Sequence, residues 1–377
     1  MANIVNVVLD IPIYHSFDYS LPKGMQKLQS GVRVEVPFGK RKSIGLVISK
    51  KNGASLNNND KFSLKEIISV IDKEPILDKS IMNLCEWSAD YYQYPLGQVI
   101  FTAIPPILRK GRLIQSIKEK KNDCIISNIK KPIKLNDEQN AIFSQIIKNL
   151  NKFKSYVIEG ITGSGKTELY IKISEYILSQ NSQILIIVPE INLTPQTVQR
   201  FQKYLNYNIE TYHSSLTESK KLGIWSRCKK GEIDIVIGTR SSSFLPFKNL
   251  SLIIVDEEHD SSLKQQEKFR YHARDIAIVR AMKSNIPVIL GSATPSFETL
   301  QNCHNNKFIK YELTKRYHKT ALPKIMIIDT NIDEPIDGIS SELEKNIKSE
   351  LKDKKQILLY IGRRGFSHAL MCKTVTG

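Results

Sequence analysis

The residues GITGSGKT, Gly160 to Thr167, have the G-x-x-x-x-G-K-[ST] form of a phosphate-binding loop. The apolar run Tyr156–Ile158 before them predicts a buried strand, and apolar residues at helical spacing from Leu169 to Leu178 predict a helix after them. In that arrangement the backbone N–H groups of the turn and of the helix N-terminus face an anion. A Gly/Ser-rich turn that only caps a helix is the alternative, but the lysine, the threonine and both flanks favour the phosphate loop. We predict that the chain binds a nucleoside triphosphate.

Each polar position of this loop has an expected task. Lys166 would reach the β- and γ-phosphates, and the hydroxyl of Thr167 would ligate Mg²⁺. The backbone around the phosphates would come from Gly160, Gly163, Ser164 and Gly165.

A second polar block, Val255-Asp256-Glu257-Glu258-His259, directly follows the apolar run Leu252–Val255. Carboxylates at the C-terminal end of a parallel strand lie at the mouth where nucleotides bind. We expect Asp256 to hold, through water, the Mg²⁺ that Thr167 contacts, and Glu257 to orient and deprotonate the attacking water. An acidic surface turn is the alternative, and a phosphate loop on a neighbouring strand argues against it.

The composition points to a polyanionic partner. The 377 residues carry a formal net charge of +17, spread along the chain rather than gathered in a tail. Nucleic acid is the first candidate, and a Lys/Asn/Ile-rich compositional bias without function is the alternative. The five scattered cysteines, without a C-x-x-C, argue against a disulfide framework and a complete zinc site. No signal peptide and no membrane-length apolar run is present, so we expect a cytoplasmic protein without a membrane partner.

The pattern along the chain predicts an α/β protein, a doubly wound phosphate-loop core preceded by a small mostly β domain. Residues 1–108 contain short apolar runs between Pro/Gly turns, followed by an amphipathic helix over Ile81–Tyr94. Residues 109–134 are charged and weakly periodic and are interpreted as a basic linker. Residues 135–340 alternate strands and helices. The expected strands of the core are Tyr156–Ile158, Ile184–Val188, Ile233–Ile237, Leu252–Val255 and Pro287–Leu290.

Several longer stretches resemble one family. Asp256–His259 has the D-E-x-H pattern of superfamily-2 helicases. VPEINLTPQ (188–196), GTRS (238–241), KQQEKFRYHARD (264–275) and GSATPS (291–296) are similar to the PriA family of bacterial replication restart helicases. This resemblance implies a RecA-like core and an ATP- and Mg²⁺-dependent hydrolase that unwinds DNA in the 3′→5′ direction. It also implies branched or forked DNA and single-stranded DNA as ligands, and other primosome proteins and the single-strand binding protein as partners.

The resemblance assigns roles to residues of the core. Gln139 matches the glutamine that reads adenine, and Thr239 and Arg240 match a motif that touches the DNA backbone. Phe269 and Tyr271 fall in the family's aromatic-rich loop and would stack on unpaired bases. From the residues alone that stretch could equally begin an amphipathic helix. The motifs that couple hydrolysis to lobe movement correspond to His259, Ser292 and Thr294.

In the N-terminal domain the resemblance places a pocket for the 3′ end of a nascent strand. Phe17 would stack on the terminal base, Asp18 would accept a hydrogen bond from the 3′-hydroxyl, Gly39 would allow close approach, and Lys65 would attract the phosphate. The alternative is that Phe17 and Tyr19 are core residues.

The chain also departs from the family pattern. The linker occupies the place of a winged-helix module. Residues 341–377 resemble only the start of a second helicase lobe, with a lone predicted strand at Ile357–Ile361, so we expect a C-terminally truncated chain. Of the family's zinc cysteines only Cys372 is present, and Val375 stands where its partner should be. Arginines of the second lobe that complete hydrolysis are missing.

Three hypotheses follow. The first is an ATP-driven replication restart helicase. The second is a shortened relative that binds fork DNA and ATP without unwinding. The third, a phosphate-loop enzyme acting on a small molecule, leaves the basic charge and the Asp256–His259 block unexplained.

Overall fold

The computed structural model describes residues 4–22, 28–51, 64–113, 133–161, 163–189, 195–315, 324–329, 332 and 339–360. The chain forms two compact units, Met1–Lys319 and Thr320–Gly377. Everything that positions a site lies in the first unit.

The first unit begins with a five-stranded antiparallel sheet of order β2-β1-β4-β3-β5. Its strands are β1 (Ile4–Leu9), β2 (Phe17–Ser20), β3 (Arg33–Phe38), β4 (Arg41–Lys51) and β5 (Ser69–Val70). All six residues of β1 are buried, because one face packs Val5 and Val7 into the sheet's own core while Val8 faces the helices below. The three apolar runs of this region that suggest strands correspond to β1, β3 and β4.

Three helices follow this sheet: α1 (Lys79–Tyr91), α2 (Leu96–Thr102) and α3 (Pro106–Arg109). The side chain of Asp78 caps α1 by accepting a hydrogen bond from the Ile81 amide at 2.8 Å. The helix predicted over Ile81–Tyr94 is thus present but ends three residues earlier. A buried ion pair between Arg33 and Asp72, 2.6 Å apart, joins β3 to the chain that leads into α1.

The rest of the unit is built on a seven-stranded parallel sheet of order β12-β6-β11-β10-β7-β9-β8. Its strands are β6 (Ser155–Gly160), β7 (Gln183–Ile187), β8 (Ile209–Tyr212), β9 (Ile235–Gly238), β10 (Leu250–Asp256), β11 (Val288–Ser292) and β12 (Ile309–Leu313). The five predicted core strands are confirmed. The expectation that the phosphate loop and the acidic block follow neighbouring strands is wrong, because β11 lies between β6 and β10.

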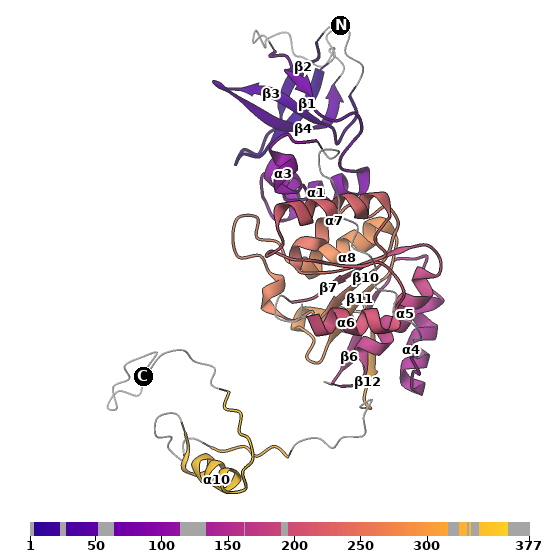
Figure 1. Ribbon diagram of the computed structural model, residues 1–377, viewed down its shortest axis with the longest axis vertical. Helices are drawn as coiled ribbons and strands as arrows, with labels where there is room; N and C mark the ends of the chain where they lie inside the picture. Colours follow the sequence, from indigo (N-terminus) through magenta and orange to yellow (C-terminus); the bar gives the residue numbers. More distant parts are fainter. Residues whose placement is uncertain are drawn as a thin grey trace, which may run out of the picture. The chain divides into compact units, whose positions relative to one another are not determined.

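Helices cover both faces of the parallel sheet (Figure 1). They are α4 (Asp137–Ile147), α5 (Lys166–Leu178), α6 (Pro195–Tyr204), α7 (Glu218–Lys230), α8 (Ala273–Ser284) and α9 (Phe297–His304). Alternate strand residues enter two separate cores: Tyr156 and Ile158 pack with α4 to α6, and Val157 lies in the core that contains α7 and α8. Strands buried on both faces are typical of doubly wound folds. The predicted α/β architecture with a small preceding β domain is therefore confirmed.

The N-terminal helices share the second of these cores with α7 and α8. Trp225 of α7 is 1% exposed, and its indole N–H donates to the Ala103 carbonyl at 2.9 Å. Lys229 of the same helix donates to the Ile76 carbonyl at 3.0 Å. The antiparallel sheet and the parallel sheet are therefore anchored to each other through α1 to α3.

The described part of the second unit contains helix α10 (Ser341–Lys352). Residues 355–360 form no strand, and Leu358 and Tyr360 are more than 90% exposed. The predicted strand at Ile357–Ile361 is therefore not formed over its described residues, because they have no ladder partner there. Ile361, Cys372 and residues 114–132 of the predicted linker lie outside the described residues. Within the described part of the chain, no helix is long and apolar enough to span a membrane.

Candidate nucleotide and DNA sites

The phosphate loop joins β6 to α5 in the conformation that its glycines permit. Gly163 and Gly165 have φ of +81° and +87°, which a residue with a Cβ adopts only under strain. No atom lies within 4 Å of the position that a Cβ on Gly163 would occupy. Lys166 opens α5, and its ammonium donates to the Gly160 carbonyl at 2.7 Å, so the cation lies over the loop. The hydroxyl of Ser164 is buried and finds no hydrogen-bond partner among the described residues.

Gln139 holds the loop from behind. It is completely buried and forms a capping box at the start of α4, exchanging hydrogen bonds of 2.9 Å with Asn136. Its amide nitrogen donates to the carbonyls of Ser164 and Gly165 at 3.3 and 3.1 Å. Both polar ends of the side chain are therefore engaged. Gln139 therefore supports the phosphate loop in this structure, and its reading of adenine stays a prediction.

Asp256, the last residue of β10, is held close to the phosphate loop. The hydroxyl of Tyr170, on α5, donates to Oδ1 of Asp256 at 3.2 Å. Burial, followed by the neighbouring charge of Glu257, raises the pKa of Asp256 to about 6, although the Lys166 charge and the Tyr170 hydrogen bond oppose the increase. Tyr170 is itself buried, and its oxygen lies 1.7 Å from the position of a Cβ on Gly291. Only a glycine on β11 leaves room for this contact.

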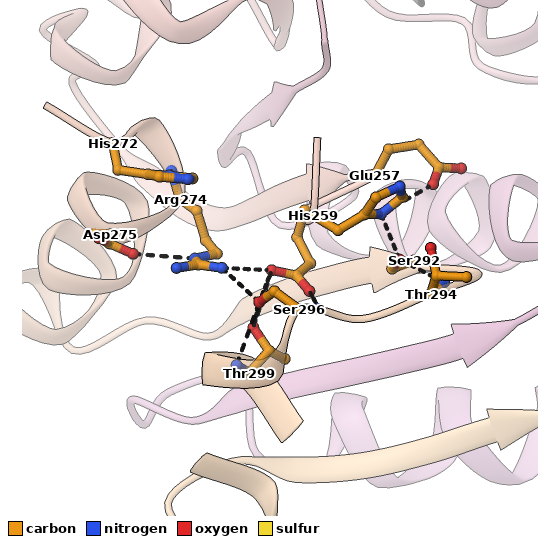
Figure 2. A network of polar contacts seen from close by, with 10 residues as sticks. Glu257, His259, His272, Arg274, Asp275, Ser292, Thr294, Ser296 and Thr299 are labelled. Carbon is orange, nitrogen blue, oxygen red and sulfur yellow. Dashed lines mark hydrogen bonds and ion pairs between the residues drawn. The ribbon is translucent and has the colours of Figure 1, made fainter. Parts of the chain in front are cut away.

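Glu257 and His259 turn away from the sheet toward the β11 loop. Glu257 has a left-handed backbone, φ +48°, and its carboxylate lies 3.7 Å from Nδ1 of His259. Nδ1 of His259 lies 2.7 Å from the Ser292 hydroxyl, which accepts a hydrogen bond from the Thr294 amide at 2.9 Å. The structure thus brings together the three residues expected to couple hydrolysis to movement, as Figure 2 shows.

Glu258 has a different environment from its neighbours. It is completely buried and accepts hydrogen bonds from Arg274 at 3.0 Å, from the Ser296 amide at 2.7 Å and from the Thr299 hydroxyl at 2.9 Å. Burial alone would lower the pKa of Arg274, but Asp275 and Glu258 outweigh that effect and raise it. Arg274, Ser296 and Thr299 thus converge on this carboxylate, and the three donors are labelled in Figure 2. Glu258 therefore ties the start of α8 to the start of α9.

The expected DNA-backbone motif begins the short helix η4 (Arg240–Phe244). Thr239 is 2% exposed, and Arg240 donates to the Ser262 carbonyl at 2.8 Å. Both residues line a hollow of about 330 Å³ that also receives Arg109 and Lys221. Four cationic side chains reach this hollow when Lys268 is included, which suits a phosphate backbone.

The four residues of the predicted 3′-end pocket lie along one edge of the antiparallel sheet. Phe17 is half-buried, with its ring centroid 5.3 Å from that of Phe38, beside Gly39. Asp18 accepts a hydrogen bond from the Asn6 amide at 2.7 Å. Gly39 has φ +59° and open space where a Cβ would lie, and Lys65 is exposed beside the end of β2. Tyr19 is buried in the core, as the alternative interpretation has it, and Phe17 is half-buried and packs against the same core.

Comparison with known proteins finds a family match for each of the two domains. The family model for the PriA 3′ DNA-binding domain matches residues 6–105, and the model for the DEAD/DEAH box helicase matches residues 137–303. The replication restart protein PriA of Haemophilus influenzae is 36% identical over 440 residues, which cover 98% of this chain and 60% of the relative. The chain belongs to the PriA family. The PriA of Treponema pallidum is 33% identical over 376 residues, covering 99% of this chain and 56% of the relative.

The chain therefore spans little more than half the length of these PriA relatives. Among solved structures it is similar to RecG bound to a three-way DNA junction, at 23% identity and a TM-score of 0.36, over 50% of this chain and 25% of that chain. A similarity at that level adds nothing to the argument. No cluster of three or more His, Cys, Asp or Glu side chains that could hold a metal occurs among the described residues, and Cys372 lies outside them.

The PriA-like aromatic loop differs from the sequence-based expectation. Phe269 and Tyr271 are 4% and 3% exposed, with ring centroids 5.0 Å apart, and both pack against Phe244. Their burial contradicts the expectation that they offer free faces to bases. The predicted helix begins only at Ala273.

Two residues of the PriA-like site were not anticipated from the sequence. Tyr170 lies on the same face of α5 as Ile173 and Ile177, at i+3 and i+7, so its helical phase indicates burial. Its contact with Asp256 depends on the order of the strands. Glu258 is the third of three consecutive acidic residues, and that pattern does not indicate which of the three is buried.

Proposed function

We propose that this chain is a replication restart protein that binds branched or forked DNA and couples ATP hydrolysis to 3′→5′ unwinding and to primosome assembly. The observation that carries the proposal is the joining of a PriA 3′ DNA-binding domain to a phosphate-loop domain within one compact unit. Because α7 is hydrogen-bonded to the N-terminal helices through Trp225, the two sites are held by a shared core.

The phosphate loop fits a magnesium nucleotide. Left-handed glycines open the turn, the Lys166 ammonium lies over it, and the buried Ser164 hydroxyl has no protein partner among the described residues. Lys166 and the loop amides would hold the phosphates, and Thr167 and Asp256 would hold Mg²⁺. When bound, the ion neutralises charge on the β- and γ-phosphate oxygens.

The protein groups around that nucleotide divide the remaining work. Glu257 is half-exposed and directly follows Asp256, and it is proposed to orient the attacking water and take its proton. His259 connects Glu257 to Ser292, so a change at the reacting end of the site would reach the β11 loop and Thr294. Tyr170 fixes Oδ1 of Asp256 and leaves Oδ2 for the metal side.

The proposed DNA-binding residues lie in the N-terminal antiparallel sheet domain and around the cationic hollow. Phe17, Asp18, Gly39 and Lys65 are proposed to hold the 3′-terminal nucleotide, and Thr239 and Arg240 to hold a strand's phosphates. Other primosome proteins and the single-strand binding protein are proposed as partners from the family resemblance, as is a place in the cytoplasm.

The test is DNA-stimulated ATP hydrolysis by the purified chain. Forked DNA with a 3′ end at the branch would be compared with no DNA, and Lys166→Ala would serve as the inactive control. Turnover that rises with the fork and vanishes in Lys166→Ala supports the enzyme. Tight fork binding without turnover would leave the second hypothesis, a fork-binding and ATP-binding protein that does not unwind. Absence of fork binding would refute both.

A further inference from the structure

The carboxylate of Glu138 holds the chain just after the last strand of the parallel sheet. Glu138 lies in the first turn of α4, and its Oε1 accepts a hydrogen bond from the Thr314 hydroxyl at 2.7 Å. Its Oε2 accepts the backbone N–H groups of Thr314 and Lys315 at 3.1 and 3.4 Å. The bond from the Thr314 hydroxyl lowers the pKa of Glu138 most, and the two backbone bonds add to this effect. One carboxylate therefore receives three donors from two successive residues, the first of them 176 positions later in the sequence.

These donors lie at the point where the described chain leaves the first unit. Thr314 and Lys315 directly follow β12 and are the last described residues of that unit. Among the described strands β12 pairs with β6 alone, because it is the outermost strand of the parallel sheet (Figure 1). An edge strand leaves one side of its backbone unpaired. The position of the chain after β12 therefore depends more on side-chain contacts such as those of Glu138.

The end of β12 also packs against the phosphate loop. Leu313 is buried and lies opposite Gly160 in the parallel register. The Cβ of Leu313 lies 3.1 Å from the position that a Cβ on Gly160 would occupy, and the Ser164 hydroxyl lies 2.5 Å from the same position. A side chain at Gly160 would meet both residues, so a glycine is what lets the loop and the end of β12 touch.

The residue after Glu138 binds the loop itself. Gln139 donates to the carbonyls of Ser164 and Gly165. Glu138 and Gln139 are consecutive in the first turn of one helix, so a shift of the loop carbonyls that moves Gln139 also moves the Glu138 carboxylate. α4 and the end of β12 share a packed core, since Ile142 lies in the same buried cluster as Leu313. The first turn of α4 is thus a short, firmly packed link between the loop and the chain after β12.

The alternative is that Glu138 serves only its own helix. An acidic residue in the first turn of a helix is favoured by the helix dipole whatever else it contacts. Asp137 has the same advantage one position earlier, and it is exposed and makes no hydrogen bond with any described residue. Glu138 differs from Asp137 in the three donors that it receives, and the two residues therefore form a matched pair for experiment.

We propose that Glu138 is a positioning residue that ties the chain at Thr314 and Lys315 to the nucleotide state of the phosphate loop. Phosphates bound by the loop amides fix Ser164 and Gly165, Gln139 follows their carbonyls, and the Glu138 carboxylate tightens on its donors. Such coupling is reciprocal: if a nucleotide stabilises the contact between Glu138 and Thr314, that contact strengthens nucleotide binding by the same factor. This inference rests on the proposed function, because it requires that the loop binds a nucleotide.

The experiment is amide hydrogen exchange of the full chain, with and without Mg²⁺ and a non-hydrolysable ATP analogue. In the parent the analogue should slow exchange of the Thr314 amide about 2-fold to 10-fold, the range of one hydrogen bond. Glu138→Ala should remove this nucleotide-dependent difference and weaken binding of the analogue by the same factor. Glu138→Gln keeps the length and an acceptor oxygen, and it should restore much of both. A merely structural role would change exchange equally with and without the analogue.

Asp137→Ala is the matched control and should leave the nucleotide-dependent difference unchanged. Thr314→Val removes the hydroxyl donor from the other side of the contact and should reduce the difference, so the test does not depend on the folding of Glu138→Ala alone. A parent that binds the analogue without slower exchange at Thr314 would overturn this inference and leave the proposed function intact, as would a Glu138→Ala variant that keeps the difference. A parent that does not bind the analogue would overturn the inference and contradict the proposed function with it.

Discussion

Removing the charge of Asp256 should make the protein more stable while abolishing its ATP chemistry. Asp256 is the last residue of β10, and its pKa is raised from 3.8 to about 6 because desolvation and Glu257 disfavour the carboxylate. A carboxyl group whose folded pKa exceeds its unfolded pKa opposes folding wherever it is ionised in both states. Asp256→Asn removes that cost and keeps an oxygen that can accept the Tyr170 hydrogen bond.

The size of the effect follows from the pKa. An increase of about two units at about 1.4 kcal/mol per unit gives an upper value of about 3 kcal/mol at pH 8. Lys166 lies near the Asp256 carboxylate and can move to stabilise its charge. We therefore expect Asp256→Asn to raise the free energy of unfolding by about 1–3 kcal/mol. In a unit of this size each kcal/mol corresponds to roughly 2–4 °C or somewhat less, so the melting temperature of Asp256→Asn should exceed that of the parent by a few degrees.

The stability difference between the parent and Asp256→Asn depends on pH. Above pH 6 the parent carries the full cost of the buried charge. As the pH falls from about 6 toward 3.8 the folded carboxyl is protonated first, so the parent recovers stability relative to the variant. The difference between parent and variant should therefore be large at pH 8 and small near pH 4.5.

Thermal unfolding in EDTA without nucleotide, at pH 8 and near pH 4.5, measures this difference. Added Mg²⁺ and ATP should stabilise the parent more than Asp256→Asn, because the variant loses one of the two proposed metal ligands and keeps only Thr167. An Asp256→Asn variant that is no more stable than the parent at pH 8, or a difference that is the same at both pH values, would refute the reasoning.

Three further changes test neighbouring contacts. Glu258→Gln should destabilise the protein by up to about 3–5 kcal/mol in chemical unfolding, because Arg274 would lose its completely buried charged partner and keep only the partly exposed Asp275. Glu175→Gln, which breaks the exposed pair with Lys172, is the control and should change stability by less than about 0.5 kcal/mol; equal effects would contradict the assignment. Tyr170→Phe removes a hydrogen bond that lowers the pKa of Asp256, so the acidic limb of the ATPase pH profile should move to higher pH. Gly291→Ala should act in the same direction, since its Cβ would meet the Tyr170 oxygen, and an unmoved limb in both variants would exclude this role. Trp225→Phe leaves the buried Ala103 carbonyl without its donor and should cost about 1–3 kcal/mol in the same unfolding assay, whereas a cost near zero would mean that the contact does not join the two sheets.

Local pattern was enough to predict the central strands of both sheets, but β2, β5, β8 and β12 were not predicted. The loop Gly160–Thr167 and the acidic block Asp256–His259 each depend on residues close in sequence, and both lie where strand periodicity places them. The order of the strands does not follow from such patterns. That β11 separates β6 from β10 depends on the pairing of β11 with β6, a segment more than a hundred residues earlier, and this order places Gly291 beside Tyr170.

Aromatic residues were predicted less well, for a related reason. The residue types of Phe269 and Tyr271 do not indicate whether their rings face solvent or the core. Tyr92 and Tyr94, which pack against Phe269, lie just after α1, some 175 positions earlier. The periodicity of the loop itself does not indicate this contact. The contact of Gln139 with the carbonyls of the phosphate loop likewise joins segments some 25 positions apart, and the pattern around Gln139 does not indicate it.

The opposite behaviour expected of Asp256 and Glu258 explains how a costly site can persist in a stable core. Glu258 is completely buried and surrounded by donors from Arg274, Ser296 and Thr299, whereas Asp256 is partly exposed and is bonded by the Tyr170 hydroxyl and the Glu257 backbone. An incompletely satisfied carboxylate is what a metal-binding position requires, since saturated oxygens cannot ligate. The stability lost at Asp256 is offset two residues later by a fully bonded glutamate that anchors α8 and α9 to the same strand end. A carboxylate that destabilises the fold but serves function and a carboxylate that stabilises the fold are thus only two residues apart.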